Sequence, residues 1–419
     1  MNRREQLSHR QLGILRDMLQ NCDNNKIKVL HGVRGSGKLT LLRKLEDTLV
    51  ANGVGQDQII ELDIECFRRD ISNDSLLLKS QILERLGPKD RRYYVMLNQL
   101  TFINGWEQIL YELLNQYQIS FFMTSSYANW YSDTFRSLFG GNYLEYRFYP
   151  MSFSEYLETK DIVGMQSVES MFQQYLRYGS LTPLNSFLLD DHTAKVIANG
   201  MYNTILVNDL MHHNVIKDTP MFERLAQYMM RNIGVLGSPK SISDYFTLFG
   251  YKVASETISN YLTALENSYM FYKIPRYDIL AQKELKNRGK YFIVDTGLRH
   301  ALTNNYDDLG YELENTVLFE LLRRGCQVQI GKIGKSEIDF VATKNGSTVY
   351  YQISRTISRQ EDFYVREHLP LLRIKDPHAK KVILSMDQEF PEEDGIEFKN
   401  ILEFLCEDSP DSRYFEKRP

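Results

Sequence analysis

The sequence predicts an α/β protein whose N-terminal part is a parallel sheet flanked by helices. Short apolar runs typical of buried strands lie at 26–30, 59–63, 93–97 and 119–123, and helical patterns separate them. Such alternation favours a parallel sheet, because parallel strands need crossover connections. A glycine-rich loop directly follows the first run, and the alternation ends near Pro150. These observations define the first of several structural parts.

Two changes of pattern follow this first part. From about residue 152 the periodicity is mainly helical, with predicted helices at Ser241–Phe249 and Ser255–Asn267 and a strand at Tyr269–Ile274. Helix, turn, helix and strand in this order predict a winged-helix unit. A second mixed α/β region follows. We therefore divide the chain into an N-terminal α/β domain (1–150), a helical and winged-helix region (151–278), a C-terminal α/β domain (279–390) and an acidic segment (391–419).

The composition is that of a globular chain and excludes several classes of protein. Of 419 residues, 43% are hydrophobic and 25% are charged, which argues against long disorder. The net charge of -4 means that binding to nucleic acid would require a local basic patch. Four cysteines without a CxxC pair favour neither a zinc site nor a disulfide framework. We find no bilayer-spanning apolar run and no signal-peptide core, so we expect a cytoplasmic protein without a membrane partner.

The glycine-rich loop is the clearest indication of chemistry. It has the pattern GxxxxGK, from Gly32 to Lys38, between a predicted strand and a predicted helix. Glycines let the backbone wrap closely around a phosphate, and the helix N-terminus attracts the negative charge. Lys38 is expected to reach the β- and γ-phosphates. The alternative is a tight turn without a ligand. We expect ATP or ADP to bind through Gly32, Val33, Arg34, Gly35, Ser36, Gly37, Lys38, Leu39 and Thr40.

Two places depart from a magnesium-dependent ATPase. Leu39 stands where a Ser or Thr hydroxyl binds Mg²⁺, and Thr40 is turned about 100° away on the helix. The strand at 93–97 ends in Asn98 and Gln99, where an Asp would hold the metal and a Glu would polarise water. An amide is no base and is a poorer ligand for a hard cation. We expect phosphate binding to survive and magnesium binding to be weakened, unless this strand is not the metal-binding one.

Several further blocks, in order along the chain, resemble one protein family. They are YVMLNQLTFINGW (94–106), FMTSS (122–126), FYPMSFSEYL (148–157), TISNYLTALENSYMFYKIPRYD (257–278), KYFIVDTGLRHAL (290–302), LENTVLFELL (313–322), EIDF (337–340) and RIKDPHAKKVILSMD (373–387). With the loop, they resemble the bacterial and archaeal AAA-type ATPases that carry a C-terminal domain of unknown function with a nuclease-like core. The resemblance covers residues 26–390. It implies an AAA-type P-loop domain followed by helical, winged-helix and nuclease-like parts.

The resemblance also locates departures from the family pattern. Leu39 falls on the family's Thr, and Asn98 and Gln99 fall on its Asp and Glu. Asn142 falls on an Arg that resembles a charge-stabilising group for the γ-phosphate, whereas Ser126 matches the polar sensor residue. Losing one preorganised electrostatic group costs roughly 10²–10³ in rate, although such losses are not additive. We therefore expect ATP hydrolysis to be weak or absent.

The C-terminal α/β domain resembles the PD-(D/E)xK nuclease fold. Such nucleases use acids to hold Mg²⁺ and a Lys to orient water or stabilise charge. Glu314 and Asp339 match the first two acids, but Gln352 and Ser354 stand where a Glu and a Lys are needed. We expect no nuclease activity and no metal site here.

DNA is a possible partner that the charge pattern does not favour. The second predicted helix of the winged-helix unit, Ser255–Asn267, contains no Lys or Arg, so its attraction to phosphates would be poor. A basic stretch at Lys283–Lys290, with Arg276 and Arg299 nearby, is a better candidate, but it is equally typical of a solvated loop.

The sequence as a whole predicts a nucleotide-binding pseudo-ATPase that serves as an interaction or regulatory module, with a protein as a possible partner. One alternative is an active Mg²⁺-dependent ATPase in which Asp63 or Glu65 replaces the missing acids. Another is a DNA-binding protein with a nuclease-like domain, and a third is a scaffold that binds no nucleotide.

Overall fold

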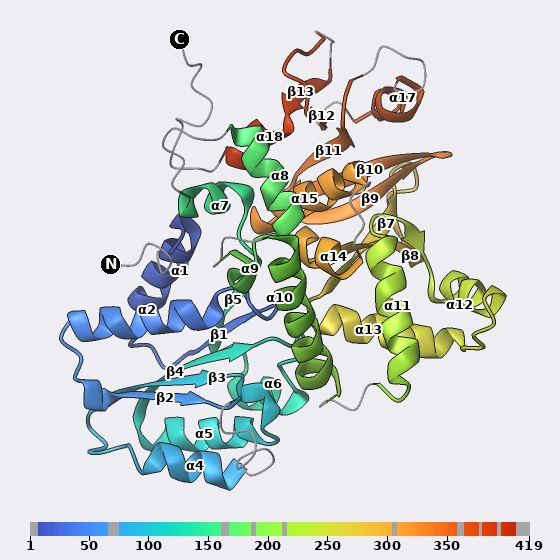
Figure 1. Cartoon of the computed structure of the whole chain (residues 1–419). Coiled ribbons are helices and arrows are strands. Elements are labelled where there is room, and N and C mark those ends of the chain that lie inside the picture. Colours follow the sequence, from blue (N-terminus) through green and yellow to red (C-terminus); the bar gives the residue numbers. More distant parts are fainter. Residues whose placement is uncertain are drawn as a thin grey trace. The chain divides into compact units, whose positions relative to one another are not determined.

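The chain forms two compact units in the computed structural model (Figure 1). Unit 1 comprises Met1–Pro150, Asn203–Asn214 and Asn267–Tyr269, and unit 2 comprises the remaining residues. The structure describes residues 7–65, 75–160, 167–185, 190–211, 216–303, 308–357, 364–376, 379–391 and 395–407. Much of the predicted acidic segment, 392–394 and 408–419, lies outside the described residues.

A five-stranded parallel sheet forms the centre of unit 1, as the sequence predicts. The strand order is β2-β3-β4-β1-β5. The strands are β1 (Ile27–Gly32), β2 (Ile59–Asp63), β3 (Arg92–Asn98), β4 (Gln118–Ser125) and β5 (Tyr143–Phe148). All four strand pairs are parallel. The first four strands match the predicted apolar runs. Helices connect them, and the main ones are α1 (His9–Gln20), α2 (Lys38–Ala51), α4 (Ser75–Leu83), α5 (Trp106–Gln116) and α6 (Asp133–Phe139).

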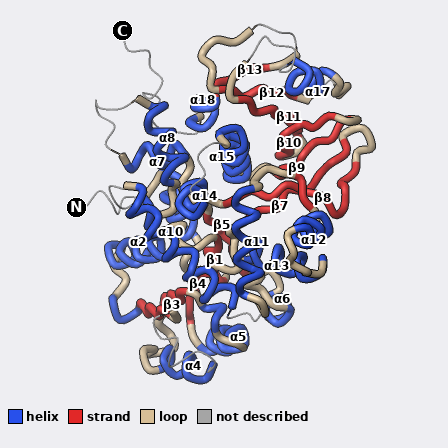
Figure 2. Tube along the Cα trace, turned by 45° about the vertical axis from the view of Figure 1, so that its right-hand side comes forward, coloured by secondary structure: helices blue, strands red, loops and turns tan. Residues whose placement is uncertain are grey.

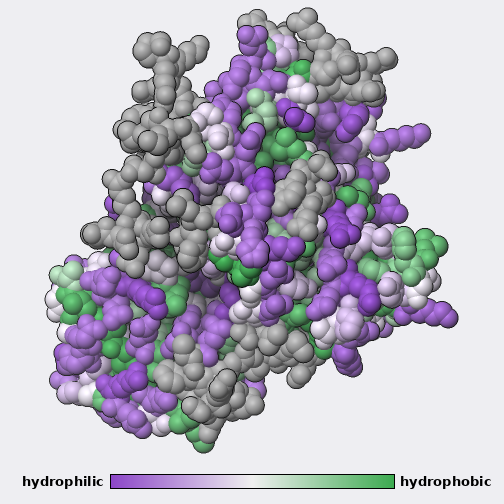
Figure 3. Space-filling view, in the orientation of Figure 1, coloured by the Kyte–Doolittle hydropathy of each residue, from purple (hydrophilic) through white to green (hydrophobic). Residues whose placement is uncertain are grey.

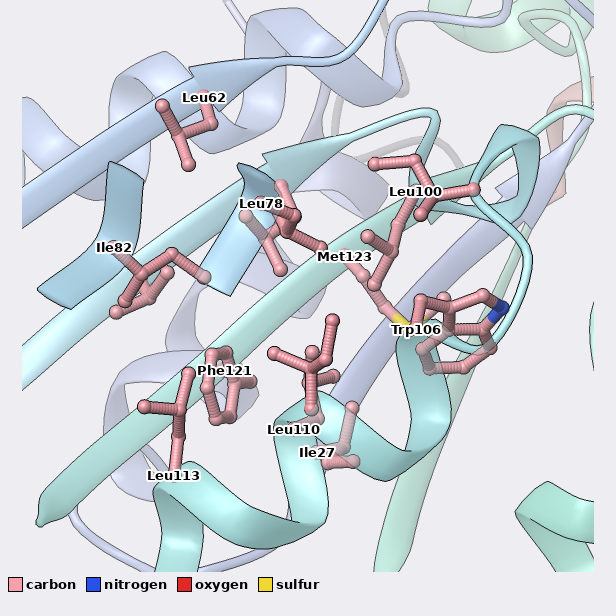
Figure 4. Packing of buried hydrophobic residues seen from close by; sticks show 14 of the residues in the cluster. Ile27, Leu62, Leu78, Ile82, Leu100, Trp106, Leu110, Leu113, Phe121 and Met123 are labelled. Carbon is pink, nitrogen blue, oxygen red and sulfur yellow. The ribbon is translucent and has the colours of Figure 1, made fainter. Parts of the chain in front are cut away.

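Helices cover both faces of this sheet, which explains why its central strands are continuously apolar. Successive residues of β4 point to opposite faces, so that Phe121 joins one core cluster and Phe122 the other. The first cluster includes α4, α5 and α6, and Figure 4 shows how its side chains interlock. The second includes α1 and α2. Burial of a large apolar side chain contributes about 1.5–3 kcal/mol, so these layers stabilise the sheet whose strand ends position the site.

Unit 2 contains an eight-stranded mixed sheet in the order β13-β12-β11-β10-β9-β7-β8-β6 (Figure 2). Its strands are β6 (Leu236–Gly237), β7 (Phe271–Asp278), β8 (Lys283–Ile293), β9 (Gln327–Ile333), β10 (Ser336–Lys344), β11 (Ser347–Ser354), β12 (Lys380–Ser385) and β13 (Glu397–Asn400). Its helices include α7 (Phe153–Thr159), α8 (Val168–Tyr178), α10 (Asp191–Thr204), α11 (Thr219–Arg231), α12 (Pro239–Leu248), α13 (Ser255–Asn267), α14 (Thr296–Thr303), α15 (Leu309–Arg323), α17 (Leu369–Leu372) and α18 (Ile401–Cys406).

This sheet changes three expectations. The predicted boundary at 278/279 falls between β7 and β8, which are hydrogen-bonded to each other, so 151–278 and 279–390 share one sheet. The basic stretch predicted as a possible loop begins β8. Arg299 is fully buried and donates to Glu312 and Asp308, so it is not part of a basic surface. The β7–β8 pairing and the burial of Arg299 override the local indications, because the polar sequence of the stretch reveals neither.

The order α11, β6, α12, α13, β7, β8 contains the predicted helices and strand, and β8 lies between β6 and β7. The winged-helix description of this arrangement stays a prediction. At the end of α12, Leu248 and Phe249 are 85% and 63% exposed. Elsewhere, hydrophilic residues cover much of the described surface on the face drawn in Figure 3. Within the described ranges, no helix is both long enough and apolar enough to cross a bilayer.

Candidate functional site

The carboxyl ends of the parallel strands in unit 1 meet at one edge of the sheet. The glycine-rich loop follows β1, Asp63 ends β2, Asn98 ends β3 and Ser126 directly follows β4. Asp63 and Asn98 are register partners. Because parallel strands bring the same ends together, residues from four separate segments converge here. Ligands of open α/β sheets bind in this position.

The backbone of the loop requires its glycines. Gly35 and Gly37 have φ angles of 81° and 93°, in the left-handed region that side chains disfavour. At Gly32 a Cβ atom would lie 2.0 Å from the carbonyl oxygen of Phe148 on β5. Helix α2 then begins at Lys38, which places its free N–H groups and positive dipole end next to the loop. These backbone features suit a phosphate, and phosphate binding by the loop stays a prediction.

Lys38 folds back onto the loop. Its Nζ donates hydrogen bonds of 2.8 Å to the carbonyl oxygens of Gly32 and Val33, and its side chain is buried. Burial, reinforced by the positive charge of Arg34, lowers the pKa of Lys38 to about 7. The ammonium therefore lacks a full anionic partner in this structure, and a bound phosphate would supply one.

Ser36 presents a second group that suits an anion. It lies in the loop and is 5% exposed, and its hydroxyl has no hydrogen-bond partner within the described part of the chain. A buried unpaired hydroxyl costs free energy. A phosphate oxygen at the loop would accept its hydrogen bond, so the residues present fit a nucleotide phosphate.

Arg34, the third residue of the loop, is held by two carboxylates. Its Nε and Nη2 donate to Asp209 at 3.2 and 2.7 Å, and its Nη1 donates to Glu65 at 2.7 Å. Burial opposes the charge of Arg34, but Asp209 and Glu65 outweigh this effect and raise its pKa. Burial raises the pKa of Asp209, and Arg34 opposes that rise. Sequence reasoning missed Asp209, since it lies on a distant short helical segment, η4 (Ile205–Met211).

The amides at the end of β3 are engaged with neighbouring strands. Asn98 donates through Nδ2 to Asp63 Oδ1 at 3.0 Å and accepts through Oδ1 from the Thr124 hydroxyl at 2.5 Å. Gln99 donates through Nε2 to Ser126 Oγ at 2.7 Å and accepts from the Ser126 N–H at 3.1 Å. The predicted sensor residue and the two predicted Walker B positions therefore form one hydrogen-bonded set, which contains no carboxylate except that of Asp63.

Side-chain oxygens at the same strand ends are already engaged in hydrogen bonds. Leu39 offers no oxygen, and the carbonyl oxygen of the Asn98 amide already accepts a hydrogen bond. Asp63 accepts from both Asn98 and the backbone N–H of Glu65, and the Glu65 carboxylate pairs with Arg34. Across the described ranges, no three or more Asp, Glu, His or Cys residues are arranged to hold a metal ion.

Asn142, which falls on a charge-stabilising Arg of the family pattern, does not lie beside the glycine-rich loop. Its carbonyl oxygen accepts from the N–H of Ile27, where β1 begins, and the next residue, Tyr143, pairs with Ile27. The glycine-rich loop follows the other end of β1, where Gly32 pairs with Phe148. Ile27 and Gly32 are five positions apart along β1, or ~17 Å. Asn142 therefore lies at the opposite edge of the sheet.

The nuclease-like positions gather in unit 2, together with a lysine that the sequence did not assign to them. Lys290 of β8 places its Nζ 3.2 Å from Glu314 Oε2 and 2.8 Å from Glu337 Oε1. Burial alone would lower the pKa of Lys290, but Glu314, Asp339 and Glu337 raise it above its usual value. Lys290 thus neutralises part of an acidic centre.

Gln352 occupies the middle of the same centre. Its Oε1 accepts from the N–H of Asp339 at 2.6 Å, and its Nε2 donates to Glu367 Oε2 at 2.6 Å. Burial, reinforced by Asp339, raises the pKa of Glu314 to about 8 and that of Glu367 to about 7, and burial raises that of Asp339 to about 6. Ser354 instead donates to the carbonyl oxygen of Thr356 in its own turn. Three of the four predicted positions therefore lie close to this centre.

Comparison with known proteins decides the family. The AAA domain family matches residues 24–157, and a domain family of unknown function matches residues 169–309. An uncharacterized protein of Haemophilus influenzae is 33% identical over 395 residues, covering 94% of this chain and 97% of that protein. The chain belongs to one family with this relative, and its AAA domain makes it a protein of the AAA-type ATPase family. An uncharacterized protein of Methanocaldococcus jannaschii is 21% identical over 381 residues, covering 87% of this AAA-type chain and 83% of that protein.

Solved structures similar to this AAA-type protein include the Walker-type ATPase of Pyrococcus abyssi. Its TM-score is 0.46 and its identity 13%, covering 70% of this chain and 95% of that one. The Aeropyrum pernix ORC1 protein, solved in complex with DNA, has a TM-score of 0.33 and 12% identity, covering 72% and 94%. With TM-scores under 0.5, these likenesses assign neither a substrate nor a partner to this chain.

Proposed function

We propose that this AAA-type protein binds ATP or ADP through Gly32–Lys38, hydrolyses ATP slowly or not at all, and acts as a nucleotide-responsive interaction module. The observation that carries the proposal is the contrast between the two halves of the site. The loop offers Lys38 and the Ser36 hydroxyl to an anion. The adjacent strand ends offer amides whose hydrogen bonds are already satisfied by the protein.

Phosphate binding and magnesium binding are separable at such a site. A bound Mg²⁺ would neutralise charge on the phosphates. At the strand ends, the carboxylate that would attract this cation is that of Asp63. However, Asn98 and Gln99 are neutral and cannot act as bases. We therefore propose weak magnesium dependence of nucleotide binding, and no efficient activation of water.

Calorimetric titration of ADP and ATP, with and without Mg²⁺, tests nucleotide binding. Wild type should bind, and removing Mg²⁺ should change Kd by less than about tenfold. Lys38→Ala should lose binding, because the loop then lacks its ammonium. Lys44→Ala, whose side chain is on α2 and pairs with Asp47, is the matched control and should bind normally. No binding by wild type, or binding that survives Lys38→Ala, would refute the proposed site.

Nucleotide affinity should fall as the pH rises. The pKa of Lys38 is about 7 in the structure without nucleotide, and a phosphate anion favours the charged form. Binding above pH 7 must therefore take up a proton, and ADP affinity should decrease by about tenfold per pH unit between pH 7.5 and 9. Titrations in buffers of different ionisation enthalpy measure the proton uptake. If the Lys38→Arg variant binds ADP, its affinity should not depend on pH, since Arg stays charged. A wild-type ADP affinity that stays constant between pH 7.5 and 9 would contradict proton uptake by Lys38.

For unit 2 we propose a nuclease-like fold without nuclease activity, and a winged-helix arrangement built from the helices and strand predicted within residues 241–274. Lys290 and Arg276 of the basic stretch and its surroundings pair with Glu314 and Glu337. They are therefore not available as a phosphate-binding surface. DNA incubated with the protein and Mg²⁺ should remain intact, and cleavage lost in Asp339→Ala would overturn this part.

A further inference from the structure

A buried carboxylate from another segment, that of Asp209, already pairs with the phosphate loop. Asp209 has a side chain that is only 2% exposed, and both of its carboxylate oxygens accept hydrogen bonds from Arg34. Arg34 is two residues from Ser36 and four from Lys38, within the same GxxxxGK loop. The Asp209 charge also acts on Lys38, whose pKa it raises against the stronger effect of burial. The internal carboxylate therefore stabilises both cations of the loop.

The Asp209 carboxylate and a nucleotide phosphate would compete for the guanidinium of Arg34. A phosphate gains most from cations that are free to pair with it. Here each nitrogen of the Arg34 guanidinium donates to a carboxylate, two to Asp209 and one to Glu65. Two carboxylates beside the loop also repel a polyanion through a partly desolvated environment, where charges interact more strongly than in water.

We propose that Asp209 is a built-in competitor for phosphate, which withholds Arg34 from the loop until a nucleotide displaces it. The proposal rests on the proposed nucleotide binding and adds its regulation. Arg34 becomes a phosphate ligand when a nucleotide is bound, and Asp209 loses its bidentate partner. The coupling is reciprocal: the factor by which nucleotide favours displacement of η4 from the loop equals the factor by which displacement of η4 strengthens nucleotide binding.

Asp209 lies on a segment of unit 1 that is inserted in the chain between parts of unit 2, so its release from Arg34 can affect unit 2. The segment Asn203–Asn214 belongs to unit 1, whereas the residues on both sides of it along the chain, Tyr202 and Val215, belong to unit 2. Release of Asp209 therefore acts on a segment that is covalently continuous with unit 2 at both ends. Asp209 can be paired with Arg34 or released from it. A nucleotide shifts the balance between these two arrangements by as much as its affinity for them differs.

The test is ADP titration of wild type, Asp209→Asn and Glu65→Gln at pH 7. Asp209→Asn should bind ADP about tenfold more tightly than wild type. Glu65→Gln should show a smaller gain, since Glu65 is 28% exposed and makes one hydrogen bond to Arg34. Asp133→Asn is the matched control, because the Asp133 side chain is fully exposed on α6 of the same unit, and it should bind as wild type does. Circular dichroism establishes that each variant is folded.

The outcomes separate the competitor from the proposed function. Equal or weaker ADP binding by folded Asp209→Asn overturns the competitor and leaves nucleotide binding intact. If neither wild type nor any variant binds ADP, both proposals fail. Should Asp209→Asn not fold, hydrogen exchange of wild type decides: amides of residues 205–211 should exchange faster with saturating ADP, and unchanged or slower exchange overturns the competitor.

Discussion

Restoring the missing groups at the strand ends should raise Mg²⁺-dependent ATP hydrolysis by about 100- to 1,000-fold. The variant combines Leu39→Thr, Asn98→Asp and Gln99→Glu. The oxygens introduced at positions 39 and 98 would supply metal ligands, and the carboxylate introduced at position 99 would supply a base next to Ser126, which Gln99 already contacts. One preorganised electrostatic group is worth roughly 10²–10³ in rate, and groups that act together are not additive. Steady-state phosphate release at saturating ATP measures the gain.

The single substitutions report how the gain arises. Asn98→Asp places a carboxylate where Asn98 Nδ2 now lies 3.0 Å from Asp63 Oδ1, so two like charges would meet. This variant should melt at a lower temperature than wild type without Mg²⁺ and regain stability when Mg²⁺ is added. Adding Lys38→Ala to the triple variant is the control and should abolish its activity. A triple variant that binds ATP and Mg²⁺ but hydrolyses no faster than wild type would show that the amides are not what limits the rate.

Replacing Lys290 with Met should destabilise the protein by about 3–5 kcal/mol. Lys290 is 6% exposed and pairs with Glu314 and Glu337, and removing one member of a buried ion pair leaves uncompensated charge. Lys332→Met on β9 is the matched control. Lys332 is 33% exposed and pairs with Asp278, so its loss should cost about 1 kcal/mol or less. Urea unfolding measures both.

The pH dependence of the Lys290→Met loss has a definite sign. The pKa of Glu314 is raised to about 8 by burial and Asp339. A carboxyl whose folded pKa is raised favours the folded state at low pH, and this contribution is lost as the pH rises toward 8. Without the ammonium the carboxyl should hold its proton still more strongly. The loss of stability should therefore be smaller at pH 6 than at pH 8.5. Equal stability of the two Lys variants would contradict the role given to Lys290.

Local patterns predicted four of the five strands of unit 1 and missed the edge strand β5. The strands β1, β3 and β4 are buried on both faces, so each contains an apolar run that stands out in the sequence. The edge strand β2 is only partly buried but still has the apolar run IIELD. The edge strand β5 alternates exposed and buried residues, such as Glu145 and Phe148, and shows no such run. In unit 2, β8 begins with the polar run KELKNRGK and becomes a strand through pairing with β7. β7 ends at Asp278 and β8 begins at Lys283, so the two strands form a hairpin whose pairing the polar run does not reveal.

The candidate site shows the same division. The loop and the ends of β3 and β4 were predictable because each lies within one short motif. Asp209 was not, since its role arises from the packing of η4 beside the loop, and a single Asp in a helical stretch carries no such information. Lys290 was assigned to a basic stretch by its neighbours in sequence, although its side chain enters the acidic centre. Asn142 was placed by resemblance, and strand register puts it at the other edge.

We propose that this AAA-type protein binds ATP and hydrolyses it slowly or not at all. The most direct measurement incubates the wild-type chain with γ-labelled ATP and Mg²⁺, separates the protein-bound nucleotide, and quantifies intact ATP, ADP and phosphate over time. We expect bound, intact ATP, and phosphate formation no faster than in Lys38→Ala. Repeated turnover of ATP that disappears in Lys38→Ala would contradict it, and would mean that Asp63 or another group performs the chemistry that Asn98 and Gln99 lack.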